Sequence, residues 1–451
     1  MENLMPFATY RLLQMLESAG HEAYVVGGCV RDSLLGRTPK DWDITTDATP
    51  NEVKKVFENS NFKIVDTGIK HGTVSVIVGT EPHEITTYRS DGDYSDNRRP
   101  DSVTFVKNLR QDLSRRDFTI NAMAYSPTKG LVDLFGGTQD LEDKQIRCVG
   151  NPFTRFEEDA LRILRAMRFA SELGFEYEIG TMGAMHEHKA LLHNISSERI
   201  GSELIKMLIG KDFTGALVYS FPILFEIIPE MELCHGFQQN NPHHVFDVFF
   251  HSIAAVDALP QNLTLRLTML LHDIAKPQHF TLDDAGIGHF YGHAESGASM
   301  AREILTRLRF DNKTVSTVAT LIKHHDNEIA ATHRSIKRWL NKLDDIEMFR
   351  LLLEVKRADA KTQAPVFREE KMKHLEKVES MLAEILNKKD CFAIRDLTIN
   401  GNDVMALGVP QGKQVGNILK KAMEEVISGT VANDRHELLL LIEQLSYEMR
   451  N

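Results

Sequence analysis

Two carboxylates and a pair of glycines near the N-terminus have the types and spacing needed for chemistry on nucleotide phosphates. Asp41 and Asp43 are two residues apart at an expected strand, so their side chains point to the same side of it. Two carboxylates placed in this way can hold two Mg²⁺ ions and organise in-line attack on a phosphate. Gly27 and Gly28 let the backbone pack beneath a triphosphate, and Arg31 can grip its oxygens. An ordinary strand–turn–helix with solvated acids is the alternative, but the two features together favour nucleotidyl transfer.

A second basic motif follows at Arg115-Arg116-Asp117, which leads into an apolar segment and presents its charges at the mouth of that segment. Arg116 can neutralise the negative charge that develops on a phosphate in the transition state. Taken alone, the motif is equally compatible with a cluster of surface salt bridges. We therefore interpret it only together with the upstream carboxylates.

A row of charged residues recurs at every third position of a helix expected over residues 153–173: Asp159, Arg162, Arg165 and Arg168. Asp159 and Arg162 form one natural unit, because residues three apart are neighbours on a helix. A carboxylate accepts from the amino group of cytosine or adenine while a guanidinium donates to the adjacent ring nitrogen. Uracil and guanine place a carbonyl opposite the carboxylate, and each buried mismatch costs ~1–3 kcal/mol. The pair therefore predicts selection of C and A, although an exposed ion pair is the plain alternative.

A histidine-rich region lies between residues 243 and 326. It contains His244, Asp247 and His251 at helical spacing, then His272-Asp273, His293, and finally His324-His325-Asp326. An adjacent His-Asp at the end of an apolar helix, with histidines on neighbouring helices, can build a divalent-metal site. The pattern resembles the HD phosphohydrolase domain. The ligands we expect are His251, His272, Asp273 and Asp326. Core histidines are the alternative, and hydrolysis stays open because such domains can persist as scaffold.

The composition is that of an ordinary globular protein, and 451 residues imply two to four domains. A net charge of −11 argues against broad nucleic-acid binding, although arginines are concentrated in the first 170 residues. The four cysteines, 29, 148, 234 and 391, form no CxxC pair, which argues against disulfides and a cysteine zinc site and suits the cytoplasm. No signal segment or membrane-spanning run is evident.

The chain is expected to be of the α+β class, with an N-terminal head of mixed sheet and helices followed by an all-α remainder. Strands are expected at 23–26, 42–45, 73–78, 84–88 and 130–134. The clearest helices after residue 150 are expected at 153–173, 198–209, 245–258, 263–274, 297–308 and 344–357. The expected domains are a head (1–145), a helical neck (146–235), an HD-type helical domain (236–335) and a helical body that binds tRNA (336–451).

Several motifs in this order resemble those of bacterial tRNA nucleotidyltransferases, the CCA-adding enzymes of the class shared with bacterial poly(A) polymerases in the polymerase-β superfamily. They are Gly27-Gly28-Cys-Val-Arg31-Asp, Leu35-Gly36-Arg37, Asp41-Trp-Asp43, Arg115-Arg116-Asp117-Phe-Thr-Ile-Asn-Ala and Glu158-Asp159-Ala-Leu-Arg162-Ile-Leu-Arg165. The segment from Ile394 to Asp403, with Asn433-Asp-Arg435, resembles the bacterial tail. The motifs of the head cover the first 175 residues and are specific as a set.

The resemblance implies a polymerase-β-like nucleotidyltransferase head and assigns roles to residues. Asp41 and Asp43 would be catalytic and bind Mg²⁺, with Glu84 as a weaker third carboxylate, while Gly28, Arg31 and Arg116 would contact the triphosphate. Asp159 and Arg162 would read the base, with Arg165 and Arg168 nearby. The segment 89–107, with Tyr94, Asp96, Arg98-Arg99 and Pro100, resembles the loop associated with switching from C to A addition. The implied partners are tRNA, ATP and CTP, with no membrane and no obligate protein partner.

Three alternatives remain open. Addition of A only or CC only, or poly(A) synthesis, would use nearly the same residues, although the segment 89–107 favours full CCA addition. A metal phosphohydrolase with a merely nucleotide-binding head would depend on His272 rather than Asp41. A silent RNA chaperone is disfavoured by the intact carboxylate pair. Six basic residues of the C-terminal part are expected to meet tRNA phosphates, although interleaved acids make a mixed solvated face equally compatible: Lys356, Arg357, Lys361, Arg368, Lys371 and Lys373.

Overall fold

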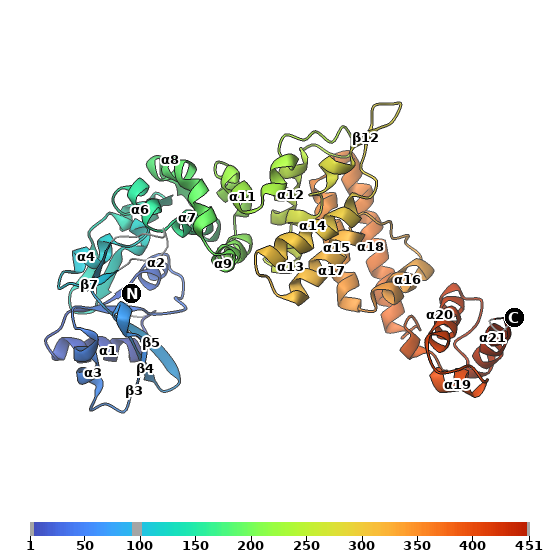
Figure 1. The fold of residues 1–451 in the computed structure, drawn as a ribbon, viewed down its shortest axis with the longest axis horizontal. Coiled ribbons are helices and arrows are strands. Elements are labelled where there is room, and N and C mark those ends of the chain that lie inside the picture. Colours follow the sequence, from blue (N-terminus) through green and yellow to red (C-terminus); the bar gives the residue numbers. More distant parts are fainter. Residues whose placement is uncertain (1–3, 93–101, 449–451) are drawn as a thin grey trace. The chain divides into compact units, whose positions relative to one another are not determined.

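The computed structural model describes residues 4–92 and 102–448, and the chain divides into two compact units, Met1–Glu232 and Leu233–Asn451 (Figure 1). Unit 1 contains the mixed sheet and unit 2 is almost entirely helical. The α+β class expected from the sequence is confirmed. The finer division into four domains stays a prediction.

A seven-stranded sheet in the order β3-β4-β5-β2-β1-β8-β9 forms the centre of unit 1. Its β2–β5 pair is parallel and the other pairs are antiparallel. The strands of this sheet are β1 (Ala23–Val26), β2 (Ile44–Thr46), β3 (Lys63–Gly68), β4 (Thr73–Val78), β5 (Glu81–Thr87), β8 (Met123–Ser126) and β9 (Gly130–Asp133). Every residue of β1 is buried, which explains its uninterrupted apolar sequence.

Helices surround this sheet and continue beyond it to the end of unit 1 (Figure 1). They are α1 (Phe7–Ser18), α2 (Gly28–Leu34), α3 (Pro50–Phe57), α4 (Leu109–Ser114), α5 (Gly137–Glu142), α6 (Pro152–Glu158), α7 (Leu161–Leu173), α8 (Ile179–His188), α9 (Ser197–Leu208), α10 (Phe213–Leu217) and α11 (Phe221–Ile227). Two small pairs, β6 (Arg89–Asp91) with β7 (Val103–Phe105) and β10 (Gln145–Ile146) with β11 (Glu176–Tyr177), complete the unit.

The expected single helix over 153–173 is wrong, because two helices occupy this segment. Asp159 follows α6 in an extended conformation, with φ −137° and ψ 101°, and the chain then restarts as α7. The Asp159 carboxylate accepts from the Leu161 backbone N–H at 3.1 Å and so satisfies a donor at the start of the new helix. The charged row is therefore interrupted at its first member.

Unit 2 consists of packed helices. They are α12 (Val248–Asp257), α13 (Leu263–Leu271), α14 (His293–Arg307), α15 (Asn312–His324), α16 (His333–Leu343), α17 (Ile346–Thr362), α18 (Pro365–Asn387), α19 (Gly401–Ala406), α20 (Lys413–Ser428) and α21 (Arg435–Glu448). One short hairpin, β12 (Thr281–Leu282) with β13 (Gly288–His289), interrupts the helical pattern. The last three helices share a hydrophobic core of their own that includes Val404, Ile418 and Ile442.

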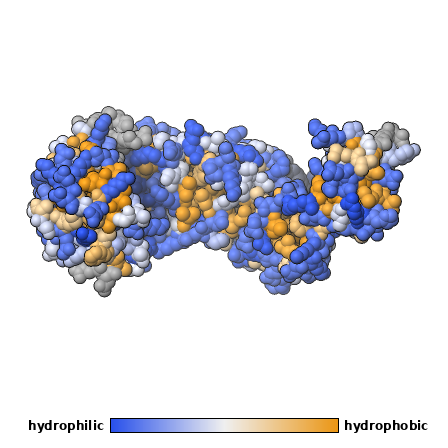
Figure 2. Space-filling model, turned by 90° about the horizontal axis from the view of Figure 1, so that it is seen from below, coloured by the Kyte–Doolittle hydropathy of each residue, from blue (hydrophilic) through white to orange (hydrophobic). Residues whose placement is uncertain are grey.

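The helix expected at 245–258 begins later than predicted. Asp247 is the N-cap of α12 and accepts from the Phe250 backbone N–H at 2.7 Å, so His244 precedes the helix instead of sharing its face with His251. On the face drawn in Figure 2 hydrophilic side chains predominate and hydrophobic ones form separate patches. Among the described helices, none combines the length and apolarity needed to cross a membrane.

Candidate active sites

The glycine turn of the head joins β1 to α2. Gly27 has φ +83°, a left-handed conformation that favours glycine, and an added Cβ there would lie 3.1 Å from Nη1 of Arg116. This close approach places the Arg116 guanidinium against the turn. A side chain at position 27 would therefore both strain the backbone and displace the arginine.

Asp41 and Asp43 lie immediately before β2, so they are not inside a strand as predicted. The backbone still alternates: Trp42 is buried, while the two aspartates on either side of it are exposed. The Val26 N–H donates to the Asp43 carbonyl oxygen at 3.0 Å, which fixes this segment beside β1. The two carboxylates therefore lie on the same side, as the spacing indicated.

Three carboxylates influence one another at this point. The pKa of Asp43 is raised above its ordinary value by partial loss of solvent and by the negative charges of Glu84, on β5, and Asp41, while Arg116 opposes the rise. Glu84 thus belongs electrostatically to the same site. An excess of carboxylates held together in this way favours the binding of a cation.

Arg116 is the cation that lies against the glycine turn and also acts on the pKa of Asp43. Its Nη2 lies 3.6 Å from Asp112 Oδ2, and its buried Nε has no hydrogen-bond partner among the described residues. Burial lowers the pKa of Arg116, and the charge of Asp112 opposes this change. The guanidinium keeps donor capacity between the glycine turn and the carboxylates, which is the requirement for holding a phosphate there.

A buried polar network connects Arg31 with Arg165. Arg31 Nη1 donates to Asn121 Oδ1 at 2.7 Å, Asn121 Nδ2 donates to Asp117 Oδ1 at 3.2 Å, and Arg165 Nε donates to Asp117 Oδ2 at 2.8 Å. Burial alone would raise the pKa of Asp117, but Arg165 lowers it well below its usual range. These partners fix the side chains of Arg31, which lies beside Gly28, and Arg165.

Phe169, on α7, provides the surface on which these arginines pack. The guanidinium carbons of Arg31, Arg165 and Arg168 lie 5.0, 5.5 and 4.1 Å from its ring centroid. Arg168 also pairs with Glu203 of α9 at 3.0 Å. Each of the three arginines also has a carboxylate partner, Asp32, Asp117 or Glu203, so ion pairs as well as cation–π contacts offset their mutual repulsion.

The two residues expected to read the base have separate partners. Asp159 Oδ2 lies 3.2 Å from Arg199 Nη2, and Arg162 Nη1 donates to Glu158 Oε2 at 2.7 Å. Arg162 Nη2 also donates to the Arg115 carbonyl oxygen at 3.0 Å. Asp159 and Arg162 therefore pair with other residues and not with each other. Their proposed contact with a base stays a prediction.

Part of the segment expected to control the change from C to A addition lies outside the described residues, namely Tyr94, Asp96, Arg98, Arg99 and Pro100. Its flanks form the antiparallel pair β6–β7, in which Arg89 is opposite Phe105. Arg89 Nη1 donates to the His71 carbonyl oxygen at 2.6 Å. The two flanks of the segment are therefore hydrogen-bonded to each other, and Arg89 connects them to the head.

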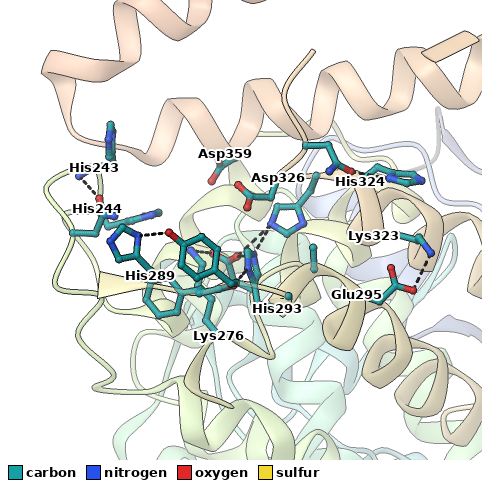
Figure 3. A pocket seen from close by; sticks show the side chains of 18 of the residues that line it. His243, His244, Lys276, His289, His293, Glu295, Lys323, His324, Asp326 and Asp359 are labelled. Carbon is teal, nitrogen blue, oxygen red and sulfur yellow. Dashed lines mark hydrogen bonds and ion pairs between the residues drawn. The ribbon is translucent and has the colours of Figure 1, made fainter. Parts of the chain in front are cut away.

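The histidine-rich region of unit 2 forms a convergent cluster around Asp273, which is 1% exposed. Figure 3 shows the pocket beside it, with His293 and Asp359 directed inward. One carboxylate oxygen, Oδ2, lies 3.1 Å from His272 Nε2 and 3.6 Å from His251 Nε2. The other, Oδ1, lies 3.5 Å from His293 Nε2 and 3.4 Å from His325 Nε2. Asp273 is therefore shared by two pairs of histidines.

Two sets of ligand atoms are close enough for a cation. The donor atoms of His251, His272 and Asp273 lie within 4.8 Å of one another, and so do those of Asp273, His293 and His325. In the part of the chain that the structure describes, these are the two groups of at least three such atoms. Imidazole and carboxylate together suit transition metals and zinc.

The opposite nitrogens of these rings are held by a second layer of hydrogen bonds. The Nδ1 atoms of His272, His293 and His325 lie 2.8, 2.7 and 2.7 Å from the carbonyl oxygens of Met269, Phe290 and Ile322. Donation by each Nδ1–H leaves each Nε2 as the lone-pair atom directed at the cluster. Metal-binding histidines are oriented by this kind of contact.

Asp359 was missed by the sequence analysis, and Asp326 was preferred in its place. Asp359, on α17, lies 3.0 Å from His251 Nε2 and 3.9 Å from His272 Nε2. Burial would raise the pKa of Asp359, but the hydrogen bond and charge of His251 lower it strongly. Asp326 is exposed and lines the cavity without joining either group (Figure 3). Asp359, which likewise belongs to neither group, is therefore a candidate additional ligand beside His251 and His272, and the assignment of Asp326 stays a prediction.

The cluster opens into a cavity of about 590 Å³. Cationic side chains reach it from several elements, namely Lys276, Lys323, Lys342 and Lys371. Lys276 is buried, 2.7 Å from Asp273 Oδ2, and also donates to Gln239 Oε1 at 2.8 Å. Four acids line the same cavity, and Lys323 donates to one of them, Glu295, at 2.8 Å: Asp273, Glu295, Asp326 and Asp359. The volume suits a polar ligand of moderate size.

The basic residues expected to meet tRNA phosphates do not form one cationic face. Lys356 donates to the carbonyl oxygens of His325 and Asn327 at 2.7 and 2.5 Å. Arg357 pairs with Glu354 and Glu379, and Lys373 pairs with Glu369. Among the six, acids therefore pair with Arg357 and Lys373, while Lys361 and Arg368 donate to backbone carbonyl oxygens. Contact of this surface with tRNA stays a prediction.

Three family models match the chain. The Poly A polymerase head domain matches residues 23–147, the probable RNA and SrmB-binding site of polymerase A matches residues 174–227, and the putative tRNA nucleotidyltransferase domain 2 matches residues 284–442. The first match contains the glycine turn, both aspartates and Arg116.

Curated relatives extend this similarity to the whole chain. The CCA-adding enzyme of Ligilactobacillus salivarius is 32% identical over 440 residues, which cover 95% of this chain and 94% of that enzyme. The CCA-adding enzyme of Lactobacillus helveticus is 55% identical over 199 residues, which are 44% of this chain and 49% of the relative. In the matches of about 50% identity or more, the aligned region spans about half the length of the relative.

Solved structures give the same result. The CCA-adding enzyme of Bacillus stearothermophilus, in complex with CTP, is similar with a TM-score of 0.71 and 28% identity, covering 98% of this chain and 97% of that one. The Thermotoga maritima CCA-adding enzyme complexed with tRNA has a TM-score of 0.62 at 20% identity, covering 97% and 95%, and supports the fold.

Proposed function

The chain belongs to the family of CCA-adding enzymes, and from this membership we propose that it adds C, C and A to the 3′ end of tRNA from CTP and ATP. The observation that carries the proposal is the grouping of Asp41, Asp43 and Glu84 with Arg116 at the glycine turn. The tRNA hydroxyl attacks the α-phosphate, and the bond to the β-phosphate breaks to release pyrophosphate. No nucleic-acid template is required, and the reaction belongs in the cytoplasm, where tRNA is matured.

The chain's own residues bind, orient and select the substrates. The Gly27–Gly28 turn, Arg31 and Arg116 hold the triphosphate, and Phe169 packs against Arg31 and keeps it in place. Asp159 and Arg162 read the pairing edge of cytosine or adenine. Because their resident partners are Arg199 and Glu158, both side chains are charged and directed before the nucleotide arrives.

We propose Mg²⁺ as the cofactor of this site, held by Asp41 and Asp43 with Glu84 nearby. The residues fit the ion, because Asp41 and Asp43 present exposed carboxylates on one side, and Glu84 lies close enough to act on the pKa of Asp43. When bound, Mg²⁺ supplies Lewis-acid stabilisation of the attacking and leaving oxygens.

The direct test is to incubate the purified protein with Mg²⁺, all four nucleoside triphosphates and a tRNA transcript that lacks its 3′ CCA, and to sequence the product ends. Ends that read CCA and stop there are expected. Ends that read CC alone, A added only to CC-ended tRNA, or long A tails would replace the proposal by the corresponding activity within the family. Asp41→Asn is the inactive control.

We propose a second activity for unit 2, hydrolysis of phosphate esters at the histidine cluster, with two divalent cations that share Asp273. The supporting observation is the pair of ligand groups, in which His272 Nε2 and both Asp273 oxygens are buried without a well-oriented hydrogen bond among the described residues. Such cations, when bound, polarise a phosphate and a water molecule. Lys276 and the rim lysines would orient the anion.

This second activity is tested in an Asp41→Asn background with p-nitrophenyl phosphate and its diester in the presence of Mn²⁺. Release of p-nitrophenol that is abolished by His272→Ala is expected. If the metal-loaded protein hydrolyses neither ester, the cluster is a structural metal site and the hydrolase proposal is wrong.

A further inference from the structure

Helix α9 presents two charged residues, four positions apart, to Asp159 in the break before α7 and to Arg168 on α7. Arg199 Nη2 lies 3.2 Å from Asp159 Oδ2, and Glu203 Oε2 lies 3.0 Å from Arg168 Nε. Positions i and i+4 share one face of a helix, so α9 approaches the row with a cation followed by an anion. The sequence alone did not indicate either contact, because 40 residues separate Arg199 from Asp159.

Asp159 depends on Arg199 more than a helical aspartate would. It lies in the extended break between α6 and α7, where no helical turn restrains the side chain, and its Oδ1 already accepts from the Leu161 N–H. Its other oxygen, Oδ2, meets Arg199. The two contacts together fix both oxygens of the carboxylate, and only the second comes from another element.

Arg199 is itself prepared for a further bond. Its Nη1 is buried and has no hydrogen-bond partner among the described residues. A buried unmade donor carries a free-energy penalty that a polar ligand can relieve. A carboxylate oxygen has two lone pairs, so Oδ2 can keep Arg199 while it accepts from the amino group of a base.

We propose that Arg199 is a positioning residue for base selection. It holds the Asp159 carboxylate so that an acceptor faces the position of the cytosine or adenine amino group and rejects the carbonyl of uracil or guanine. Without Arg199 the carboxylate can rotate away, and the penalty against the wrong base is lost. The inference rests on the proposed role of Asp159 as a base reader.

The test compares kcat and KM for single CTP and UTP additions to tRNA lacking CCA. The variants are Arg199→Gln, Arg199→Lys and Lys206→Gln, the last a partly exposed cation of the same helix that lies 3.8 Å from Glu203. We expect Arg199→Gln to lower the CTP/UTP ratio of kcat/KM by about tenfold, which corresponds to the loss of one selective contact. Arg199→Lys, which keeps a donor and the charge, should restore most of the ratio, and Lys206→Gln should not change it.

Other outcomes would overturn the inference. An equal loss for CTP and UTP in Arg199→Gln, with no rescue by lysine, would mean that the residue only supports the fold. An unchanged ratio would mean that Asp159 is held by other contacts. Asp159→Ala is measured alongside: if it leaves selection intact, the proposed base-reading role itself fails, irrespective of Arg199.

Discussion

The sharpest prediction concerns Asp273, because this one carboxylate is common to both ligand groups of the histidine cluster. Asp273→Asn keeps the shape of the side chain but removes its charge. It also leaves Lys276, 2.7 Å away and buried, without its counter-ion. Breaking a buried ion pair costs about 3–5 kcal/mol, so the metal-free variant should already unfold more easily.

The larger effect appears on adding metal. A cation at 100 times its dissociation constant stabilises a protein by about 2.7 kcal/mol per site. For a unit of 150–250 residues each kcal/mol raises the melting temperature by about 2–4 °C, so each occupied site adds about 5–11 °C. Wild-type unit 2 should thus gain roughly twice this shift with Mn²⁺ when both sites are filled, and Asp273→Asn should gain almost none.

The assay measures metal content per chain after desalting, together with thermal melting. We expect two ions per wild-type chain, none in Asp273→Asn and one in His325→Ala, which removes a ligand from only one group. His324→Ala is the matched control, since His324 is an adjacent, equally buried histidine that packs on Trp339 and belongs to neither group. Equal losses in His324→Ala and His325→Ala, or full metal content in Asp273→Asn, would refute the reasoning.

Three further predictions concern the head and helix α17. Asp43→Asn should abolish nucleotide addition yet raise the melting temperature in the absence of Mg²⁺. Partial burial, and then the charges of Glu84 and Asp41, disfavour the ionised Asp43 more than Arg116 favours it; a lower melting temperature would contradict this. Gly27→Ala and Gly20→Ala should each cost about 1–2 kcal/mol from positive φ, but only the former, which crowds Arg116, should raise KM for CTP and ATP. The pKa of Lys356 is lowered by burial to about 8, so the unfolded chain binds more protons than the folded one above that pH. The free energy of unfolding should therefore rise by about 3 kcal/mol between pH 8 and 10.5, and chemical denaturation of Lys356→Met should show no such slope.

The sequence was a good guide to the head because its signals are local. The run Tyr24–Val26 is apolar without alternation and forms a fully buried strand, and the glycine that follows adopts positive φ. Asp41 and Asp43 keep to one side because Trp42 between them is buried. Each of these features depends on neighbours within a few residues, so spacing alone predicted them.

The wrong single helix over 153–173 and the acid that was not named, Asp359, have a common origin in tertiary contacts. Helical periodicity continues through residue 159, but the Asp159 carboxylate caps a new helix and pairs with Arg199, which breaks the helix that the pattern predicted. Asp326 follows two histidines in the sequence, whereas Asp359 reaches the cluster from α17. In the sequence, Asp359 is a single acid among three basic residues, Lys356, Arg357 and Lys361. We therefore interpreted this segment as a basic surface and did not consider Asp359 as a ligand.

The two sites differ in how far their ligands are prepared for a metal, and this difference implies different binding behaviour. At the cluster the rings are fixed through Nδ1 and converge on Asp273, so a cation needs to bring no further partner. In the head, Asp41 and Asp43 are exposed, and among the described residues neither belongs to a group of three converging ligand atoms. Phosphate oxygens must then complete the coordination of Mg²⁺. The cluster should therefore bind metal in the free protein, whereas the head should bind it mainly together with CTP or ATP.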